Sequence, residues 1–210
     1  MTPSAALAVV VAGDLPLVDD LAEAIGVEAL RLGPEDVSGT DAKADWSGER
    51  VVWIHIVPAL PGGESLEESE TLLASARAAE RTAAEASAAL TFLVLLPSRG
   101  LFAGSAGLAC DLASGALEGL MRAEIGNWSA EEKRIAGIVY GGIQGHRLDG
   151  QRPEDEVRKR TPIGALAKVE QLADAIRYLG SPRAAYVTGT LLHVDGGWNA
   201  YSWIYPARTI

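Results

Sequence analysis

One stretch near the end of the chain, residues 160–198, constrains the fold more than any other part of the sequence. Between residues 169 and 179, apolar side chains recur at the i, i+3, i+4 and i+7 spacing of an amphipathic helix. Gly180 follows that segment, as glycine commonly follows the C-terminus of a helix. A Ser-Pro turn comes next, and the short apolar run 189–194 predicts a strand that ends in an Asp-Gly-Gly sequence. The stretch is therefore predicted to fold as a helix, a turn and a strand.

The same stretch closely resembles the C-terminal segment of the short-chain dehydrogenase/reductase family. The family pattern is a P-x-G loop, a helix that ends in L-x-S, and the strand motif Y-x-T-G-x-x-L-x-V-D-G-G. The matching residues, in chain order, are Pro162, Gly164, Leu179, Ser181, Tyr186, Thr188, Gly189, Leu192, Val194, Asp195, Gly196 and Gly197. The resemblance implies an α/β fold, a Rossmann-like doubly wound parallel sheet, in a single domain that covers residues 1–210 and ends in an aromatic tail, 198–210.

Composition excludes several classes of function. The chain has 210 residues and a net charge of −10, which argues against nucleic-acid binding because that function needs a basic face. No apolar run approaches the roughly 20 residues of a membrane span, and the first residues lack the basic region of a signal peptide. Cys110 is the single cysteine, so an internal disulfide and a cysteine-based metal site are both excluded. We expect a cytoplasmic protein.

The first predicted strand and helix, residues 6–12 and 15–25, frame the place where the family binds its dinucleotide. The family motif there is T-G-x-x-x-G-x-G, whose glycines let the backbone approach the pyrophosphate at the helix N-terminus. Only Gly13 of that motif stands here, and Asp14 would bring a carboxylate close to the phosphates. We therefore expect no cofactor-binding residues and no bound cofactor.

The next two predicted strands, 27–32 and 51–57, are much closer together in the chain than their family counterparts. Only 25 residues separate Leu32 from Val57, so the sheet is predicted to be shortened on its adenosine-binding side. The family's N-N-A-G sequence, which would fall near residues 55–58, is absent. His55 lies inside the apolar strand, and we expect a packed core histidine there rather than a catalytic one.

An alanine-rich helix is predicted over residues 64–90, with Leu66, Leu73, Ala76, Ala83 and Leu90 on one face. A strand over 90–96 and a helix over 109–125 follow. The sequence ALEGL at 116–120 resembles the central helix of the family, and this alignment puts Cys110 at the catalytic tyrosine and Ser114 at the catalytic lysine.

Family catalysis needs a phenol whose pKa is lowered by a nearby lysine, acting as general acid and base, and cysteine with serine does not reproduce that pair. Ser98 lies near the catalytic serine of the family, but a lone serine does not move the proton. Cys110 has no neighbouring lysine or histidine in sequence and is expected to be inert. We therefore expect no catalytic and no metal-binding residues. A strand over 133–142 and a helix over 154–160 complete the predicted elements.

The elements that this family uses for tetramer assembly are kept, whereas its cofactor and catalytic elements are lost. The resemblance thus implies a non-catalytic subunit that pairs with an active family member through helices 64–89 and 109–125, helix 169–179, strand 189–194 and the tail 198–210. Inactive subunits of this kind occur in the family, one setting being the hydroxyacyl-CoA dehydrogenases of anaerobic aromatic, benzylsuccinate-type degradation. Two alternatives stay open: a homo-oligomeric ligand-binding or regulatory protein, and an oxidoreductase that uses Cys110, Ser98 or His55.

Overall fold

The computed structural model confirms the predicted helix, turn and strand and places them in a larger parallel sheet. It describes residues 9–12, 17–25, 29–32, 50–57, 65–85, 88–98, 101, 105–130, 132–147 and 151–200. The elements, in chain order, are β1 (Val9–Ala12), α1 (Leu17–Ile25), β2 (Ala29–Leu32), β3 (Arg50–Ile56), α3 (Ser65–Glu85), β4 (Ala89–Pro97), α4 (Ser105–Ala130), β5 (Arg134–Tyr140), α5 (Glu154–Arg160), α6 (Val169–Gly180), a 3₁₀ turn (Pro182–Ala184) and β6 (Thr190–Val194).

The strands are all parallel, as a chain that alternates strands and helices requires. Four of them form a sheet in the order β3-β4-β5-β6, and β1 pairs with β2 and lies beside β3. Leu93 on β4 is opposite Ile54 on β3 and Ala136 on β5, and Ile138 on β5 is opposite Leu192 on β6. The predicted fold class is therefore confirmed.

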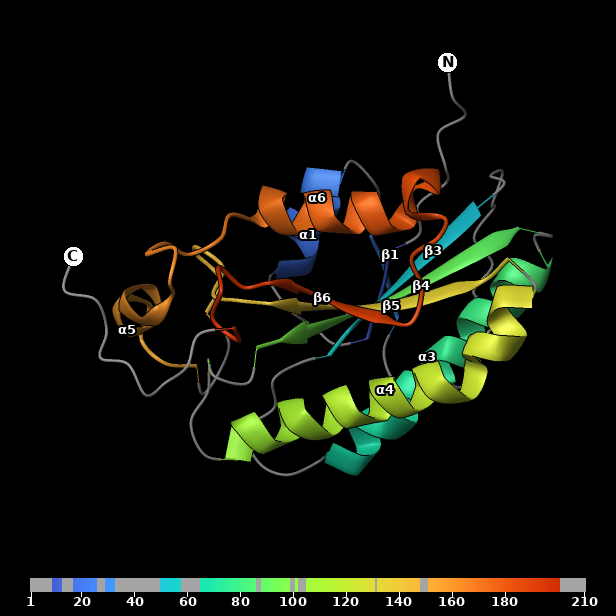
Figure 1. The fold of residues 1–210 in the computed structure, drawn as a ribbon, viewed down its shortest axis with the longest axis horizontal. Coiled ribbons are helices and arrows are strands. Elements are labelled where there is room, and N and C mark those ends of the chain that lie inside the picture. Colours follow the sequence, from blue (N-terminus) through green and yellow to red (C-terminus); the bar gives the residue numbers. More distant parts are fainter. Residues whose placement is uncertain are drawn as a thin grey trace, which may run out of the picture.

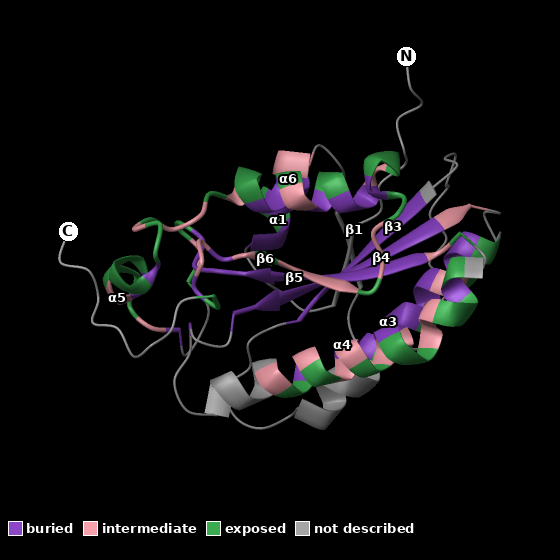
Figure 2. Ribbon diagram, in the orientation of Figure 1, coloured by how far each residue is buried: buried purple, intermediate pink, exposed green. Residues whose placement is uncertain are grey.

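Helices cover the two faces of this sheet, as Figure 1 shows. Helices α1 and α6 pack on one face, and the long helices α3 and α4 lie side by side on the other. Because both faces are covered, β4 and β5 are buried along almost their whole length (Figure 2). Alternation along the strands divides the core into two clusters, one under each pair of helices.

A buried arginine holds the connection between α6 and β6. Arg134, at the start of β5, donates from its guanidinium to the carbonyl oxygens of Leu179 (2.8 Å) and Ala184 (2.9 Å) and to the Thr91 hydroxyl (2.8 Å). These acceptors belong to the end of α6, the 3₁₀ turn and β4. One side chain thereby fixes the turn that delivers β6 to the sheet.

The prediction for the alanine-rich helix was wrong at its C-terminus, and its face was right at Ala76 and Ala83 but wrong at Leu73. Helix α3 ends at Glu85, and Leu90 lies in β4, because the run after it must enter the sheet as a strand. Leu73 is 48% exposed rather than buried. The stripe that contacts the sheet consists of Leu72, Ala76, Ala79 and Ala83, which keeps the 3.6-residue period.

Helix α4 is longer than predicted, 26 residues instead of the span 109–125. The strands and helices predicted over 15–25, 27–32, 51–57, 90–96, 133–142 and 189–194 differ from the observed elements by one or two residues at their ends, and helix 154–160 matches α5. The glycine-loop junction with Gly13 and Asp14, residues 33–49 and the tail beyond residue 200 lie outside the described residues. Within the described part, no helix has the length and apolar character needed to cross a membrane.

Candidate functional site

Strands β4, β5 and β6 end at the same edge of the sheet, so the residues that follow them come together there. Ser98 comes directly after β4, and its backbone N–H donates to the carbonyl oxygen of Tyr140 at the end of β5 (2.8 Å). Asp195 follows β6, and its turn leads to Asn199. The edge therefore gathers a serine, a carboxylate and an amide from segments about a hundred residues apart in the chain.

A chain of hydrogen bonds links these groups to His193 on β6. The Ser98 hydroxyl donates to Asn199 Oδ1 (3.0 Å), and Asn199 Nδ2 lies 3.1 Å from His193 Nδ1. Asp195 holds the turn, because its two carboxylate oxygens accept from the backbone N–H groups of Gly197 and Asn199, each at 2.9 Å. We call this arrangement the Ser98–Asn199–His193 chain.

Ser98 is the surviving residue at a family catalytic position, and the structure places it out of reach. Its side chain has no exposed surface, and its hydroxyl proton is directed at Asn199. Because that donor already has a partner, a substrate oxygen would have to displace Asn199 to reach it. Ser114, at the predicted lysine position, is a half-buried residue of α4, and the side chain of Cys110 lies outside the described residues.

His55 is a core histidine, as predicted. It is 1% exposed on β3, and strand alternation puts it on the α3–α4 side of the sheet with Val51 and Trp53. Neither ring nitrogen has a hydrogen-bond partner among the described residues. Burial lowers the pKa of His55 to about 4, so the ring is neutral at pH 7.

The residues at the start of α1 do not fit a dinucleotide. Asp19 and Asp20 stand in its first turn, both exposed, where the family places the pyrophosphate. Two carboxylates occupy the positive end of the helix dipole and repel phosphate charge. Asp20 also lies 2.9 Å from His146 Nε2. Among the residues that the structure describes, no group of three or more His, Cys, Asp or Glu is placed to hold a metal ion.

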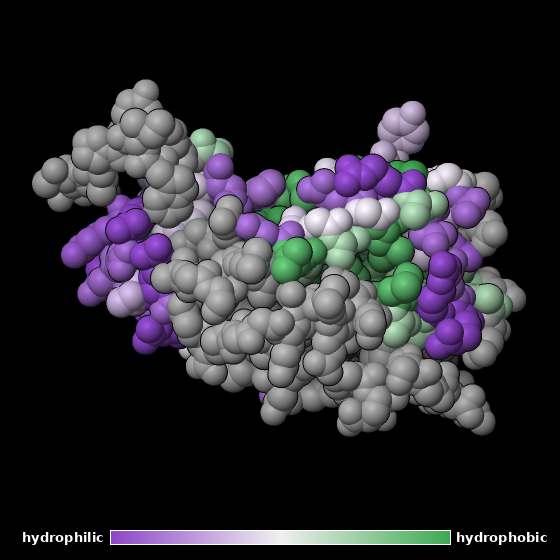
Figure 3. Space-filling model, turned by 90° about the horizontal axis from the view of Figure 1, so that it is seen from below, coloured by the Kyte–Doolittle hydropathy of each residue, from purple (hydrophilic) through white to green (hydrophobic). Residues whose placement is uncertain are grey.

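The outer surface of α3 and α4, here called the α3–α4 face, is a second candidate site. Leu73 and Leu112 are large exposed apolar residues on it, and a side-chain carbon added at Gly115 or Gly119 would meet no atom within 4 Å. Figure 3 views the molecule from below and shows apolar residues gathered between hydrophilic ones. A docking partner could approach the backbone of α4 closely at these glycines.

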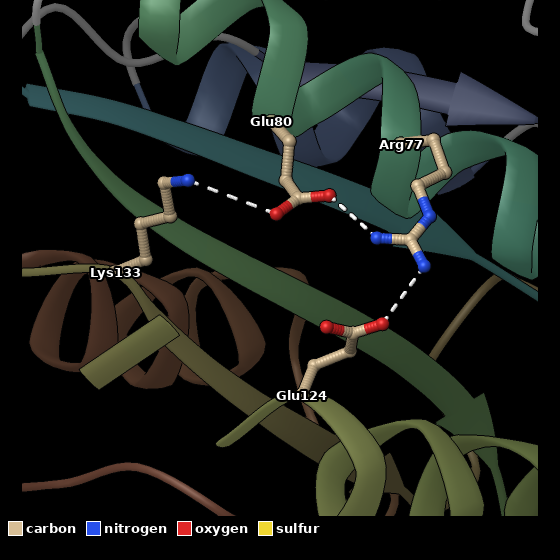
Figure 4. A network of polar contacts seen from close by, with 4 residues as sticks. All are labelled: Arg77, Glu80, Glu124 and Lys133. Carbon is tan, nitrogen blue, oxygen red and sulfur yellow. Dashed lines mark hydrogen bonds and ion pairs between the residues drawn. The ribbon is translucent and has the colours of Figure 1, made fainter. Parts of the chain in front are cut away.

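An ion-pair network ties the two helices of this face together (Figure 4). Arg77 on α3 pairs with Glu124 on α4 (2.8 Å) and with Glu80 one turn along (2.9 Å). Lys133, just before β5, lies 3.7 Å from the other oxygen of Glu80. The network links α3 to α4 through side chains at the surface of the α3–α4 face.

Sequence reasoning missed His193, Asn199 and the carboxylate role of Asp195. His193 stands at an unspecified position of the strand motif, and Asn199 follows the motif, so neither carried a signal. Their association with Ser98 depends on a contact across 101 positions of the chain. On α4, Ala113 is 2% exposed and packs in the core.

Comparisons with known proteins identify the family to which this chain is similar. Residues 68–199 match the family model described as enoyl-(acyl carrier protein) reductase. The chain is 32% identical over 76 residues to an uncharacterised short-chain type dehydrogenase/reductase, y4vI, of Sinorhizobium fredii, a match that covers 34% of this chain and 14% of that protein. It is 28% identical over 102 residues to an uncharacterised oxidoreductase, YmfI, of Bacillus subtilis, covering 46% of this chain and 42% of that one.

The chain thus spans less than half the length of these two curated relatives. Similarity to solved structures extends further. A short-chain dehydrogenase/reductase family oxidoreductase from Burkholderia thailandensis superposes with a TM-score of 0.72 at 14% identity, over 96% of this chain and 95% of that one. This likeness establishes the fold.

Proposed function

Because the chain belongs to the short-chain dehydrogenase/reductase family, we propose that it is a non-catalytic subunit that assembles with a catalytically active member of the same family. Its relatives include oxidoreductases, so the partner would carry out the redox chemistry. This chain would contribute surfaces for assembly and would influence the partner's active site.

The observation that carries this proposal is the state of Ser98. The family mechanism needs a tyrosine and a lysine with that serine, and the aligned positions here hold Cys110 and Ser114. Ser98 itself is buried and bonded to Asn199. With no lysine at the aligned position to lower the pKa of a neighbouring acid, and with the Ser98 hydroxyl bonded to Asn199, these residues do not reproduce the family's proton transfer.

A second support comes from the place of the dinucleotide. The carboxylates of Asp19 and Asp20 oppose a pyrophosphate at the N-terminus of α1. Asp14 would add a third negative charge in the preceding loop. We therefore propose that the chain binds neither NAD(H) nor NADP(H), and no catalytic step is derived for it.

The α3–α4 face supports the proposed assembly. Large apolar side chains are exposed there beside glycines, a combination that allows two pairs of helices to pack closely. Exposed apolar patches of this kind mark interaction surfaces. We propose that helices 64–89 and 109–125 meet the equivalent helices of the partner. The contact would use Leu73, Leu112 and Gly119, and not Ala113, which lies in the core.

A second proposed contact uses helix 169–179 and strand 189–194. Strand β6 is at the end of the four-stranded sheet, and within the described residues its outer edge pairs with no other strand. Tyr178 and Tyr186 are exposed beside it. Trp198 is 2% exposed and belongs to the core, so the part of the tail 198–210 proposed to reach the partner lies beyond it.

Co-expression with the intact family member encoded nearest to this chain tests the proposal. We expect a stable complex that turns over substrate, whereas the 210-residue chain alone neither turns over nor binds NAD(H) more tightly than about 1 mM, roughly −4 kcal/mol. Turnover by the chain alone would contradict the proposal and favour an oxidoreductase with unusual catalytic residues. A stable homo-oligomer that does not bind the co-expressed enzyme would instead favour a homo-oligomeric ligand-binding or regulatory protein.

A further inference from the structure

A cavity of about 360 Å³ opens where β5 and β6 end, next to the Ser98–Asn199–His193 chain. This volume falls within the range of small-molecule sites. Its apolar lining includes Leu166 and Ala167 from the segment before α6 and Val194 from β6. Its polar lining consists of Thr161, Gln171, His193 and Asp195, so the cavity offers apolar contacts together with several polar ones.

The hydrogen bonds around His193 decide which of its atoms is available. The Ser98 hydroxyl donates to Asn199 Oδ1, which directs the amide nitrogen of Asn199 toward His193 Nδ1. An amide nitrogen only donates, so Nδ1 is the acceptor of this bond and Nε2 is the ring nitrogen that carries a proton. Nδ1 also lies 3.6 Å from Asp195 Oδ2. No other hydrogen bond involves this ring within the described part of the chain. His193 therefore presents one oriented N–H donor at a half-exposed position.

Asp195 decides the charge that the cavity tolerates. Its carboxylate is almost completely buried, and both of its oxygens accept backbone N–H groups. An anion in the cavity would be repelled by this carboxylate in a partly desolvated setting. A cation would be attracted by the carboxylate but brings no acceptor for the N–H of His193. The site therefore favours a ligand that carries a hydrogen-bond acceptor without a negative charge.

We propose that this cavity binds a small uncharged molecule with an apolar body, whose hydrogen-bond acceptor takes the N–H of His193 Nε2. Ser98 and Asn199 act as positioning residues for that donor and do not touch the ligand. The proposal depends only on the geometry of this chain, so it stands apart from the proposed role as a subunit.

The test uses the full 210-residue chain and three probes built on one five-membered ring. 2-Pyrrolidone carries a carbonyl acceptor without charge, pyroglutamate adds a carboxylate, and pyrrolidine is a cation that lacks the acceptor. Amide NMR shifts of Gly196 and Gly197 report on the cavity. We expect saturable shifts with 2-pyrrolidone at roughly millimolar concentration, as suits so small a ligand, and binding at least about tenfold weaker for the other two. Equal binding of all three, or shifts that do not saturate, would overturn the proposal.

Two substitutions of His193 sharpen the result. His193→Phe keeps a planar ring without the N–H donor and should weaken the binding of 2-pyrrolidone by about tenfold or more. His193→Gln restores an N–H donor near the position of Nε2 and should stay within about threefold of the native chain. Arg183→Gln, away from the cavity wall, serves as the matched control. If the phenylalanine variant binds like the native chain, His193 does not contact the ligand. Should that variant misfold, the glutamine variant and the three probes still decide.

Discussion

Each face of the sheet is covered by two helices, but the two helix pairs expose different kinds of residue to solvent. Under α1 and α6 the core is mainly aliphatic, and the outer sides of these helices carry exposed charges such as Glu23, Glu170 and Asp174. Under α3 and α4 the core contains Trp53, Phe92 and Trp128, with the last two in edge-to-face contact at 6.0 Å. The outer side there exposes leucines, glycines and alanines.

This difference indicates which helix layer has an outer surface suited to solvent and which has one suited to a protein partner. The outer sides of α1 and α6 carry mainly charged residues, as amphipathic helices in water do, and Tyr178 is the large exposed aromatic residue among them. Helix α4 has exposed small and apolar residues along much of its length, and its most exposed charges form the pair of Glu118 and Arg122. An apolar outer face with a defined shape is typical of a helix pair that packs against another protein.

The largest expected effect concerns the buried histidine of the α3–α4 side. The native state lowers the pKa of His55 to about 4, whereas an unfolded chain keeps the ordinary value of 6.5. Stability from the neutral ring is complete above pH 6.5 and is lost as the pH falls, because the unfolded chain then binds a proton that the native chain excludes. The loss at pH 4 should be about 3 kcal/mol.

Urea unfolding at pH 7 and pH 4 measures this loss, and His55→Leu should remove about 3 kcal/mol of the difference between the two pH values. Ile54→Val, a buried apolar change on the same strand, supplies the matched control, since it removes no titratable group and should leave the difference unchanged. An equal pH dependence in the native chain and His55→Leu would mean that His55 is hydrated or paired in solution.

Gly119→Glu tests whether the partner subunit packs on the α3–α4 face. Nothing lies within 4 Å of a side chain at this exposed position, so the isolated variant should fold normally. In a helix–helix contact the carboxylate would be buried without a partner and should weaken assembly by about 100-fold, roughly 2.7 kcal/mol. Analytical ultracentrifugation measures this, with Gly119→Ala as the control. Native affinity in the glutamate variant would remove this face from the interface.

Tyr186→Ala tests the second proposed contact, on the α6 and β6 side. The side chain is fully exposed in the single chain, so its removal should not change the free energy of unfolding. If it anchors the partner, truncation should weaken assembly by about tenfold, or 1.4 kcal/mol. Titration of the partner measures the change. An unaltered affinity would leave the α3–α4 face as the single proposed contact. The α1–α6 layer would then have no part in assembly.

Deletion of residues 201–210 tests the tail and keeps the buried Trp198. The removed segment includes Tyr201, Trp203, Ile204 and Tyr205. If the tail reaches the partner's substrate cleft, the KM of the complex should rise about threefold, or roughly 0.7 kcal/mol, while the assembly persists. Steady-state kinetics on the purified complex measures it. A truncated complex with native kinetics would exclude a functional role for the tail.

The smallest expected effect concerns the ion pair between Arg77 and Glu124. The arginine side chain is about half exposed, so solvent screening keeps the contribution near 0.5 kcal/mol. A double-mutant cycle with Arg77→Ala and Glu124→Ala, followed by thermal unfolding, gives the coupling energy. Asp174→Ala with Arg177→Ala on α6 is the matched pair on the opposite layer, and its i,i+3 geometry should give a similar value. A much larger coupling in the first pair would show that it rigidifies the α3–α4 face.

The sequence predicted the C-terminal unit well because its signals are local. Amphipathic spacing in α6, a glycine at its end and an apolar run for β6 each depend on neighbours within a few positions. The alanine-rich helix was harder, because alanine suits both a buried and an exposed face. Its pattern therefore did not distinguish Leu72, which packs on the sheet, from Leu73, which is exposed.

Local pattern predicted the strands and helices of a parallel α/β fold and carried the resemblance to the family, because each depends on which residues stand at given spacings. Tertiary structure alone brought Ser98 to Asn199 and His193, and it alone left His55 without a hydrogen-bond partner among the described residues. The physical reason is that a hydrogen bond between residues 98 and 199 depends on where two strands end in one sheet, and nothing near either residue in the chain encodes that distance.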